Sequence, residues 1–189
     1  MKHNQLANGL FVTTSSPTQQ EPEYTEVLIK ADLEYYFVHA VWQEQKRLIK
    51  DSRLMNMAQA RAEDMVTRNY FSHEDPDGVW PNKHARKHAY KIPESYPDES
   101  NYVESIAAGY TSPYAALEGL HSSTAHRDHV AGRNFWVNHK IFGVGYSEGH
   151  PKYKYIYVVV TAPPEKDPPP QEEFDQHLYL PFIQGGIKI

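Results

Sequence analysis

Two strand-like segments late in the chain place the tightest constraint on its fold. The runs KIFGVGYSE, residues 140–148, and YKYIYVVVTA, residues 153–162, are rich in β-branched and aromatic residues and are separated by GHPK. A turn-forming gap of this size typically joins two antiparallel strands into a hairpin. Gly143 and Gly145 interrupt the first strand, and glycine inside a strand often marks the close approach of another backbone. We therefore expect a hairpin with a helix packed tightly over one face.

Helical periodicity precedes the hairpin. Apolar residues recur at helical spacing from Leu28 to Ile49, which predicts a first helix running to about Lys50. A second helix is expected to follow closely and to end near Asn69. Its buried face carries Leu54, Ala58, Ala62 and Met65.

Short elements occupy the middle of the chain. A short helix is expected from about Pro81 to His88, and NYVESIAAGY, residues 101–110, is expected to be a buried strand or extended segment. Ser112 followed by proline is typical of a helix start, because the hydroxyl caps the first turn and proline fits its first position. Another short helix is expected near Thr124. This mixture of elements predicts an α/β domain.

The domain boundaries follow from length and composition. A chain of 189 residues fits one domain with tails. Residues 1–24 are expected to be a flexible lead-in, 25–164 the domain, 165–170 a stiff proline-rich linker and 171–189 an apolar tail.

Composition excludes several classes of function. The net charge is -5 and no basic stripe is present, which argues against nucleic acid as a partner. No apolar run is long enough for a transmembrane segment, and the start of the chain shows no evident signal peptide. With no cysteine there are no disulfides, thiolate metal sites or cysteine nucleophiles.

Three polar residues at the edges of the expected buried elements are the candidates for chemistry. His73 lies just beyond the second helix, Glu104 lies inside an apolar strand, and His126 lies at a helix start. A carboxylate buried alone between Val103 and Ile106 would cost several kcal/mol. Glu104 therefore needs a metal, a cation or a protonated imidazole as its partner, unless strand alternation turns it to solvent.

Four runs in this order resemble a known family. They are AQARAEDMVTRNYFSHEDPDG, NYVESIAAGY, SSTAHRDHV and KIFGVGYSEG. Over roughly Ala31 to Pro164 the chain resembles the CAP superfamily of cysteine-rich secretory, antigen 5 and pathogenesis-related 1 proteins, and within it the bacterial cysteine-free branch. The resemblance implies a three-layer α-β-α sandwich with a small, mainly antiparallel sheet. It also implies a cleft lined by two histidines with acidic or hydroxyl residues.

The family's cleft residues can be placed on this sequence. Its two histidines fall on His73 and His126, and its glutamate falls on Glu104, although the run reads VES here and lacks the family's flanking glycine and asparagine. Its second acidic position is Ser123 in this chain, and a tryptophan usual at that helix is replaced by Leu120. The resemblance thus implies metal binding by the two histidines, with Glu104 and Ser123 in the same pocket.

Zinc is the metal that this set favours. Two neutral imidazoles and a carboxylate suit Zn²⁺ and leave a position for water or ligand. Mg²⁺ or Ca²⁺ would require more oxygen ligands. Binding is expected to weaken at low pH, because protons compete with the metal for the imidazoles.

Other residues that could bind metal have simpler interpretations. His84 and His88 are four residues apart on a short helix, and solvent-exposed surface histidines are the expected interpretation. His129, three residues after His126, is likewise expected to face solvent. Asp75 in the run DPDG is expected to form a turn, because the remaining ligands of a calcium loop are missing.

The function implied is a secreted or cell-surface binding module for an extracellular ligand, which could be a lipid, a glycan or a peptide. One alternative is a metal-dependent hydrolase in which Glu104 is the general base. The residue types of a hydrolytic triad are also present, as Ser123, His126 and Glu104. Another alternative is a structural envelope or coat component that uses the C-terminal tail for assembly.

Overall fold

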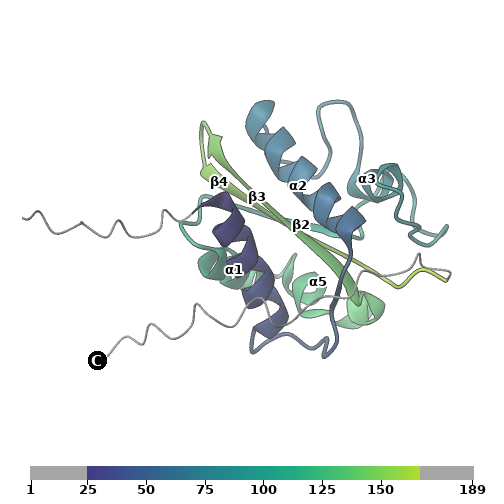
Figure 1. Cartoon of the computed structure of the whole chain (residues 1–189). Helices are drawn as coiled ribbons and strands as arrows, with labels where there is room; N and C mark the ends of the chain where they lie inside the picture. Colours follow the sequence, from purple (N-terminus) through teal and green to yellow (C-terminus); the bar gives the residue numbers. More distant parts are fainter. Residues whose placement is uncertain (1–24, 167–189) are drawn as a thin grey trace, which may run out of the picture.

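Four strands form one open sheet with helices on both of its faces (Figure 1). The computed structural model describes residues 25–166, so the expected lead-in, residues 167–170 of the linker and the C-terminal tail lie outside the described residues. The strand order is β1 (Ile49–Lys50), β3 (Ile141–His150), β4 (Lys154–Ala162) and β2 (Glu104–Ala108). Strand β1 pairs parallel with β3, and the other two pairings are antiparallel. The expected hairpin is confirmed as β3 and β4.

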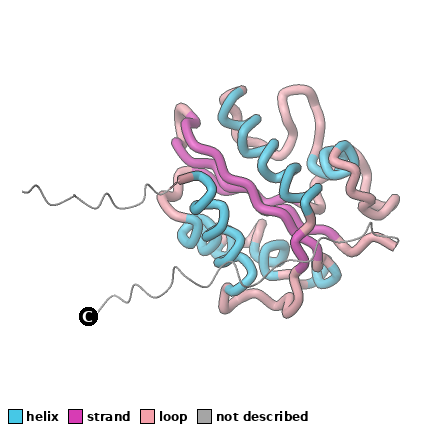
Figure 2. The backbone as a smooth tube through the Cα atoms, viewed as in Figure 1, coloured by secondary structure: helices cyan, strands magenta, loops and turns pink. Residues whose placement is uncertain are grey.

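The helices form the two outer layers (Figure 2). One layer contains α2 (Ser52–Thr67) and α3 (Pro81–Lys87). The other contains α1 (Glu26–His39), α4 (Pro113–Ser122) and α5 (Arg127–Ala131), and a 3-10 turn follows at Asn134–Asn138. Alternate residues of β2, β3 and β4 point into the two cores, because successive side chains of a strand face opposite sides. The expected α-β-α sandwich is confirmed.

Two glycines bring α2 onto the sheet. A Cβ atom added to Gly143 would lie 2.2 Å from the carbonyl carbon of Leu54, and one added to Gly145 would lie 2.2 Å from the carbonyl oxygen of Ala58. Real Cβ atoms do not come this close to backbone, so only glycine fits at either position. The expectation that a helix packs tightly over this strand is confirmed.

The prediction of a first helix running to about Lys50 is wrong. Helix α1 ends at His39, and an irregular segment leads from there to strand β1. Polar side chains fix this segment: Gln43 Nε2 donates to the Val130 carbonyl at 2.9 Å, and Gln45 Nε2 donates to the Gly132 carbonyl at 2.9 Å. Tertiary contacts therefore end the helix although the apolar spacing continues in the sequence.

The remaining elements follow the sequence closely. Helices α2 and α3 and strand β2 lie where they are expected. Ser112 caps α4, since its Oγ accepts a hydrogen bond from the Ala115 backbone N–H at 3.2 Å. Helix α5 begins at Arg127, three residues after the expected start. Within residues 25–166, none of the helices has the length and apolar character needed to cross a membrane.

Candidate functional site

The four candidate residues come together beside β2, which is an edge strand of the sheet. His73 lies in the loop after α2, Glu104 is the first residue of β2, Ser123 ends α4 and His126 precedes α5. An edge strand has only one neighbour, β4, so loops from both helical layers can reach around it. The rings of His73 and His126 lie 6.3 Å apart between centroids.

Glu104 is fully buried and carries two partners. Its side chain is 0% exposed, its Oε2 accepts from Arg61 Nε at 2.9 Å, and its Oε1 lies 2.9 Å from His73 Nδ1. Burial alone would raise its pKa, but the charge of Arg61 and the hydrogen bond from His73 outweigh burial and place that pKa below its ordinary value. Glu104 is therefore an ionised carboxylate whose buried charge is balanced by a cation.

Arg61 of α2 is the residue that the sequence interpretation missed. It is 1% exposed and donates to the Ser72 carbonyl at 2.8 Å and the His73 carbonyl at 2.9 Å, as well as to Glu104. The guanidinium therefore holds the loop that carries His73. The signal was available, because residue 61 follows Ala58 by three and precedes Met65 by four, which places an arginine on the buried face of the helix.

Each of the two histidines has its Nδ1 in a hydrogen bond to a neighbouring side chain. The Glu104 carboxylate only accepts hydrogen bonds, so His73 Nδ1 donates to it, and in the neutral ring the lone pair is on Nε2. His126 Nδ1 lies 2.9 Å from the Ser123 hydroxyl, and when that hydroxyl accepts, His126 Nε2 is likewise free. Partial burial and the nearby His73 lower the pKa of His126, so it is neutral at pH 7. Both rings retain solvent access, with the His73 side chain 28% exposed.

A metal between the two rings would need a small adjustment. Two imidazoles on one tetrahedral zinc ion bring their ring centroids to about 5 Å, so the 6.3 Å observed is about an ångström wider. Among residues 25–166, no group of three or more His, Asp or Glu side chains is arranged to hold a metal. Within the described residues, a divalent ion at this pair would therefore have two histidine ligands.

The arrangement does not favour general-base catalysis by Glu104. Both of its oxygens are engaged, and its lowered pKa makes it a weak base. It also pairs with His73 and not with His126, so Ser123, His126 and Glu104 do not form the continuous relay of a hydrolytic triad.

A second pair of histidines is buried on the other face of the sheet. His129 is 4% exposed, so the expectation that it faces solvent is wrong. Its Nδ1 lies 2.6 Å from Ser105 Oγ and its Nε2 lies 2.8 Å from Thr161 Oγ1. His139 extends this hydrogen-bond network: its Nδ1 lies 3.0 Å from the same threonine hydroxyl, and its Nε2 lies 3.0 Å from the Tyr96 hydroxyl. Burial lowers the pKa of His129 well below its ordinary value and that of His139 to about 4.

These buried histidines are expected to make stability depend on pH. Below pH about 6.5 these histidines become protonated in the unfolded chain but stay neutral in the folded chain. Each of them therefore lowers the free energy of unfolding by about 1 kcal/mol per pH unit as pH falls toward 4. His139→Gln should flatten this slope in urea unfolding measured between pH 7 and pH 5. The exposed His39 is the control, and His39→Gln should leave the slope unchanged. Parallel curves for wild type and His139→Gln would contradict this role.

The remaining candidates are held by local contacts. Asp75 forms the expected turn, since its Oδ1 accepts from the Asp77 and Val79 backbone N–H groups, each at 2.9 Å. His84 is not a solvent-exposed surface residue as expected, because its side chain is 15% exposed and its Nε2 lies 3.0 Å from Asp75 Oδ2. This contact stabilises the loop beyond His73.

Comparisons with known proteins agree with this fold. The model of the cysteine-rich secretory protein family, CAP, matches residues 44–161. No curated protein matches the chain. Among solved structures, the chain is similar to an extracellular protein containing an SCP domain from Bacillus anthracis, with 19% identity and a TM-score of 0.57; the match covers 77% of this chain and 44% of that one. The chain thus spans less than half the length of that protein.

A second solved structure is similar over nearly its whole length. It is an outer surface protein from Borrelia burgdorferi, with 17% identity and a TM-score of 0.53, and the match covers 72% of this chain and 95% of that one. At such identities the two likenesses show a shared fold. The proteins are named as extracellular and outer-surface proteins, respectively.

Proposed function

Because the chain belongs to the cysteine-rich secretory protein family, CAP, we propose that it is an extracellular ligand-binding domain in which His73 and His126 hold a divalent cation. The observation that carries the proposal is the pairing of two half-buried imidazoles 6.3 Å apart, each with its Nδ1 already engaged. Both Nε2 atoms are available as ligands when the rings are neutral and each Nδ1 carries the proton. The names of the two similar structures support an extracellular location.

Zinc is the cation that the ligands favour. Imidazole nitrogen suits a borderline metal such as Zn²⁺, whereas Mg²⁺ and Ca²⁺ prefer several oxygen ligands. The Glu104 carboxylate is already paired with Arg61, so its role is to orient His73. The zinc ion would supply open coordination positions for a donor atom of the ligand.

Binding at this site is more consistent with the contacts than hydrolysis. A hydrolase would need a base with a free lone pair directed into the cleft, and Glu104 does not offer one. The metal's open coordination positions and the surrounding surface would select which ligand binds, a lipid, a glycan or a peptide. The structural alternative depends on the C-terminal tail, which lies outside the described residues.

The proposal predicts that zinc stabilises the protein through the two histidines. Zinc in large excess over its dissociation constant should raise the melting temperature of the wild type by about 5 °C, because a ligand that binds only the folded state stabilises it. His126→Ala should remove this increase. Differential scanning fluorimetry with and without a chelator measures both effects.

A matched variant guards against nonspecific binding of zinc to surface histidines. His88→Ala removes a histidine of α3's C-terminal cap and should keep the full response to zinc. If His126→Ala responds as strongly as the wild type and His88→Ala, the ion is held elsewhere and the proposal is wrong.

A further inference from the structure

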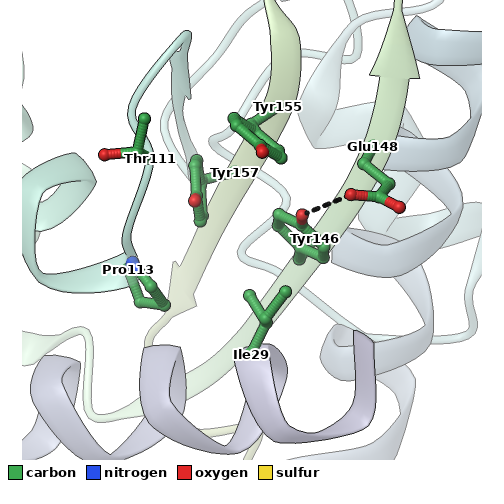
Figure 3. A pocket seen from close by; sticks show the side chains of 7 residues that line it. All are labelled: Ile29, Thr111, Pro113, Tyr146, Glu148, Tyr155 and Tyr157. Atoms are coloured by element: carbon green, nitrogen blue, oxygen red, sulfur yellow. Dashed lines mark hydrogen bonds between the residues drawn. The ribbon is translucent and has the colours of Figure 1, made fainter. Parts of the chain in front are cut away.

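A small pocket lies on the α1 and α4 face of the sheet, apart from the histidine cleft (Figure 3). Its volume is about 160 Å³, and side chains from β3, β4, α1 and the start of α4 converge on it. Tyr146 pairs with Tyr157 across the two strands, and Glu148 pairs with Tyr155. The lining is completed by Ile29, Thr111 and Pro113. Three tyrosines and one carboxylate therefore line a space that suits a small molecular group.

The aromatic rings of the pocket lie close to one another. The ring centroids of Tyr146 and Tyr157 are 5.2 Å apart, and those of Tyr146 and Tyr155 are 6.3 Å apart with nearly parallel planes. The face of an aromatic ring is electron-rich and attracts cations within about 6 Å of its centroid. One cation of the protein already uses this property, since Lys154 Nζ lies 4.8 Å from the centre of the Tyr155 ring.

The polar groups of the pocket favour a cation that donates no hydrogen bonds. The hydroxyl of Tyr146 donates to Glu148, and that of Tyr157 donates to the Tyr110 carbonyl at 3.0 Å. Burial raises the pKa of Tyr157 to about 12, so this phenol remains neutral. Glu148 is the one carboxylate in the lining, and the other oxygens are neutral hydroxyls, which is a poor ligand set for a metal ion. A quaternary ammonium requires no acceptors.

We propose that this tyrosine pocket binds a quaternary ammonium group, such as the trimethylammonium head of choline. In this arrangement the half-buried Tyr155 ring and the exposed Glu148 carboxylate contact the trimethylammonium group, and the buried Tyr146 and Tyr157 complete the lining. A volume of about 160 Å³ admits a group of this size, since cavities of about 150 Å³ in proteins hold benzene. The pocket is independent of the histidine cleft, which lies at the other end of β2 and on the opposite face.

Isothermal titration of the full chain with tetramethylammonium tests the proposal directly. The wild type should bind saturably, and Tyr155→Leu and Glu148→Gln should each weaken binding about tenfold. Tyr155→Phe keeps the ring and should stay within about twofold of the wild type. Tyr155 is half-buried and Glu148 is exposed, so these variants should fold.

Two comparisons separate this site from other causes. The neutral isostere 3,3-dimethylbutanol should bind much more weakly than choline, and His126→Ala with a chelator present should bind tetramethylammonium as the wild type does. Absence of saturable binding, or equal binding of the neutral isostere, would overturn the proposal. Flotation with phosphatidylcholine vesicles and not with phosphatidylglycerol vesicles would assign the group to a lipid head; binding of choline without flotation would assign it to a free solute.

Discussion

Replacing Arg61 by methionine is expected to lower the free energy of unfolding by about 4 kcal/mol. The side chain is 1% exposed and balances the charge of Glu104, whose side chain is 0% exposed. Without Arg61, this carboxylate would keep only the His73 imidazole as a partner for its buried charge. The donors to the Ser72 and His73 carbonyls would also be lost. Urea unfolding at pH 7 measures the loss.

Arg68, the C-cap residue directly after α2, provides the control. It pairs with Asp64 at 2.7 Å and with Asp77 at 2.6 Å, but its side chain is 32% exposed. Arg68→Met should therefore cost less than about 1 kcal/mol, because exposed ion pairs contribute little. The double variant Arg61→Met/Glu104→Gln should recover part of the loss, since it removes the charge that lacks a partner. Equal losses for Arg61→Met and Arg68→Met would show that the buried pair has no special role.

Adding one methyl group at Gly145 is expected to destabilise the protein by about 3 kcal/mol. The new Cβ would lie 2.2 Å from the Ala58 carbonyl oxygen, so α2 would have to move away from the sheet. The same helix carries Arg61, so Gly145→Ala should also displace the loop that holds His73. Thermal unfolding followed by circular dichroism measures the first effect.

Ser147 provides the matched position. It lies two residues further along β3 and therefore faces the same side of the sheet. Ser147→Ala removes one oxygen and adds no atom, so stability should change by less than about 0.5 kcal/mol. A Gly145→Ala protein as stable as the Ser147→Ala protein would mean that α2 does not rest on the strand backbone.

The sheet and its tight helix were predictable because they depend on local pattern. The β-branched run of residues 156–162 and the turn before it predict the hairpin. Gly143 and Gly145 indicate that a helix packs closely against the backbone of the first strand. The end of α1 was not predictable in this way. Gln43 and Gln45 bond to carbonyls about 90 residues later in the chain, and such contacts leave no periodic signal.

The residues of the candidate site were predictable, but the hydrogen bonds and ion pairs between them were not. The sequence indicates that Glu104 needs a partner, and the structure supplies Arg61, which is 43 residues earlier in the chain. The same limit applies to His129, whose partners Ser105 and Thr161 come from two different strands. Sequence spacing cannot show which buried polar groups meet across layers. An arginine on an apolar helix face is the signal to look for.

The most direct test is diffraction from crystals grown with zinc, with data collected above and below the zinc absorption edge. If the two histidines hold zinc, an anomalous difference peak will lie between His73 Nε2 and His126 Nε2, about 2 Å from each, with Glu104 still paired to Arg61. A zinc peak at other histidines, with the His73 and His126 rings left uncoordinated, would contradict the proposed site.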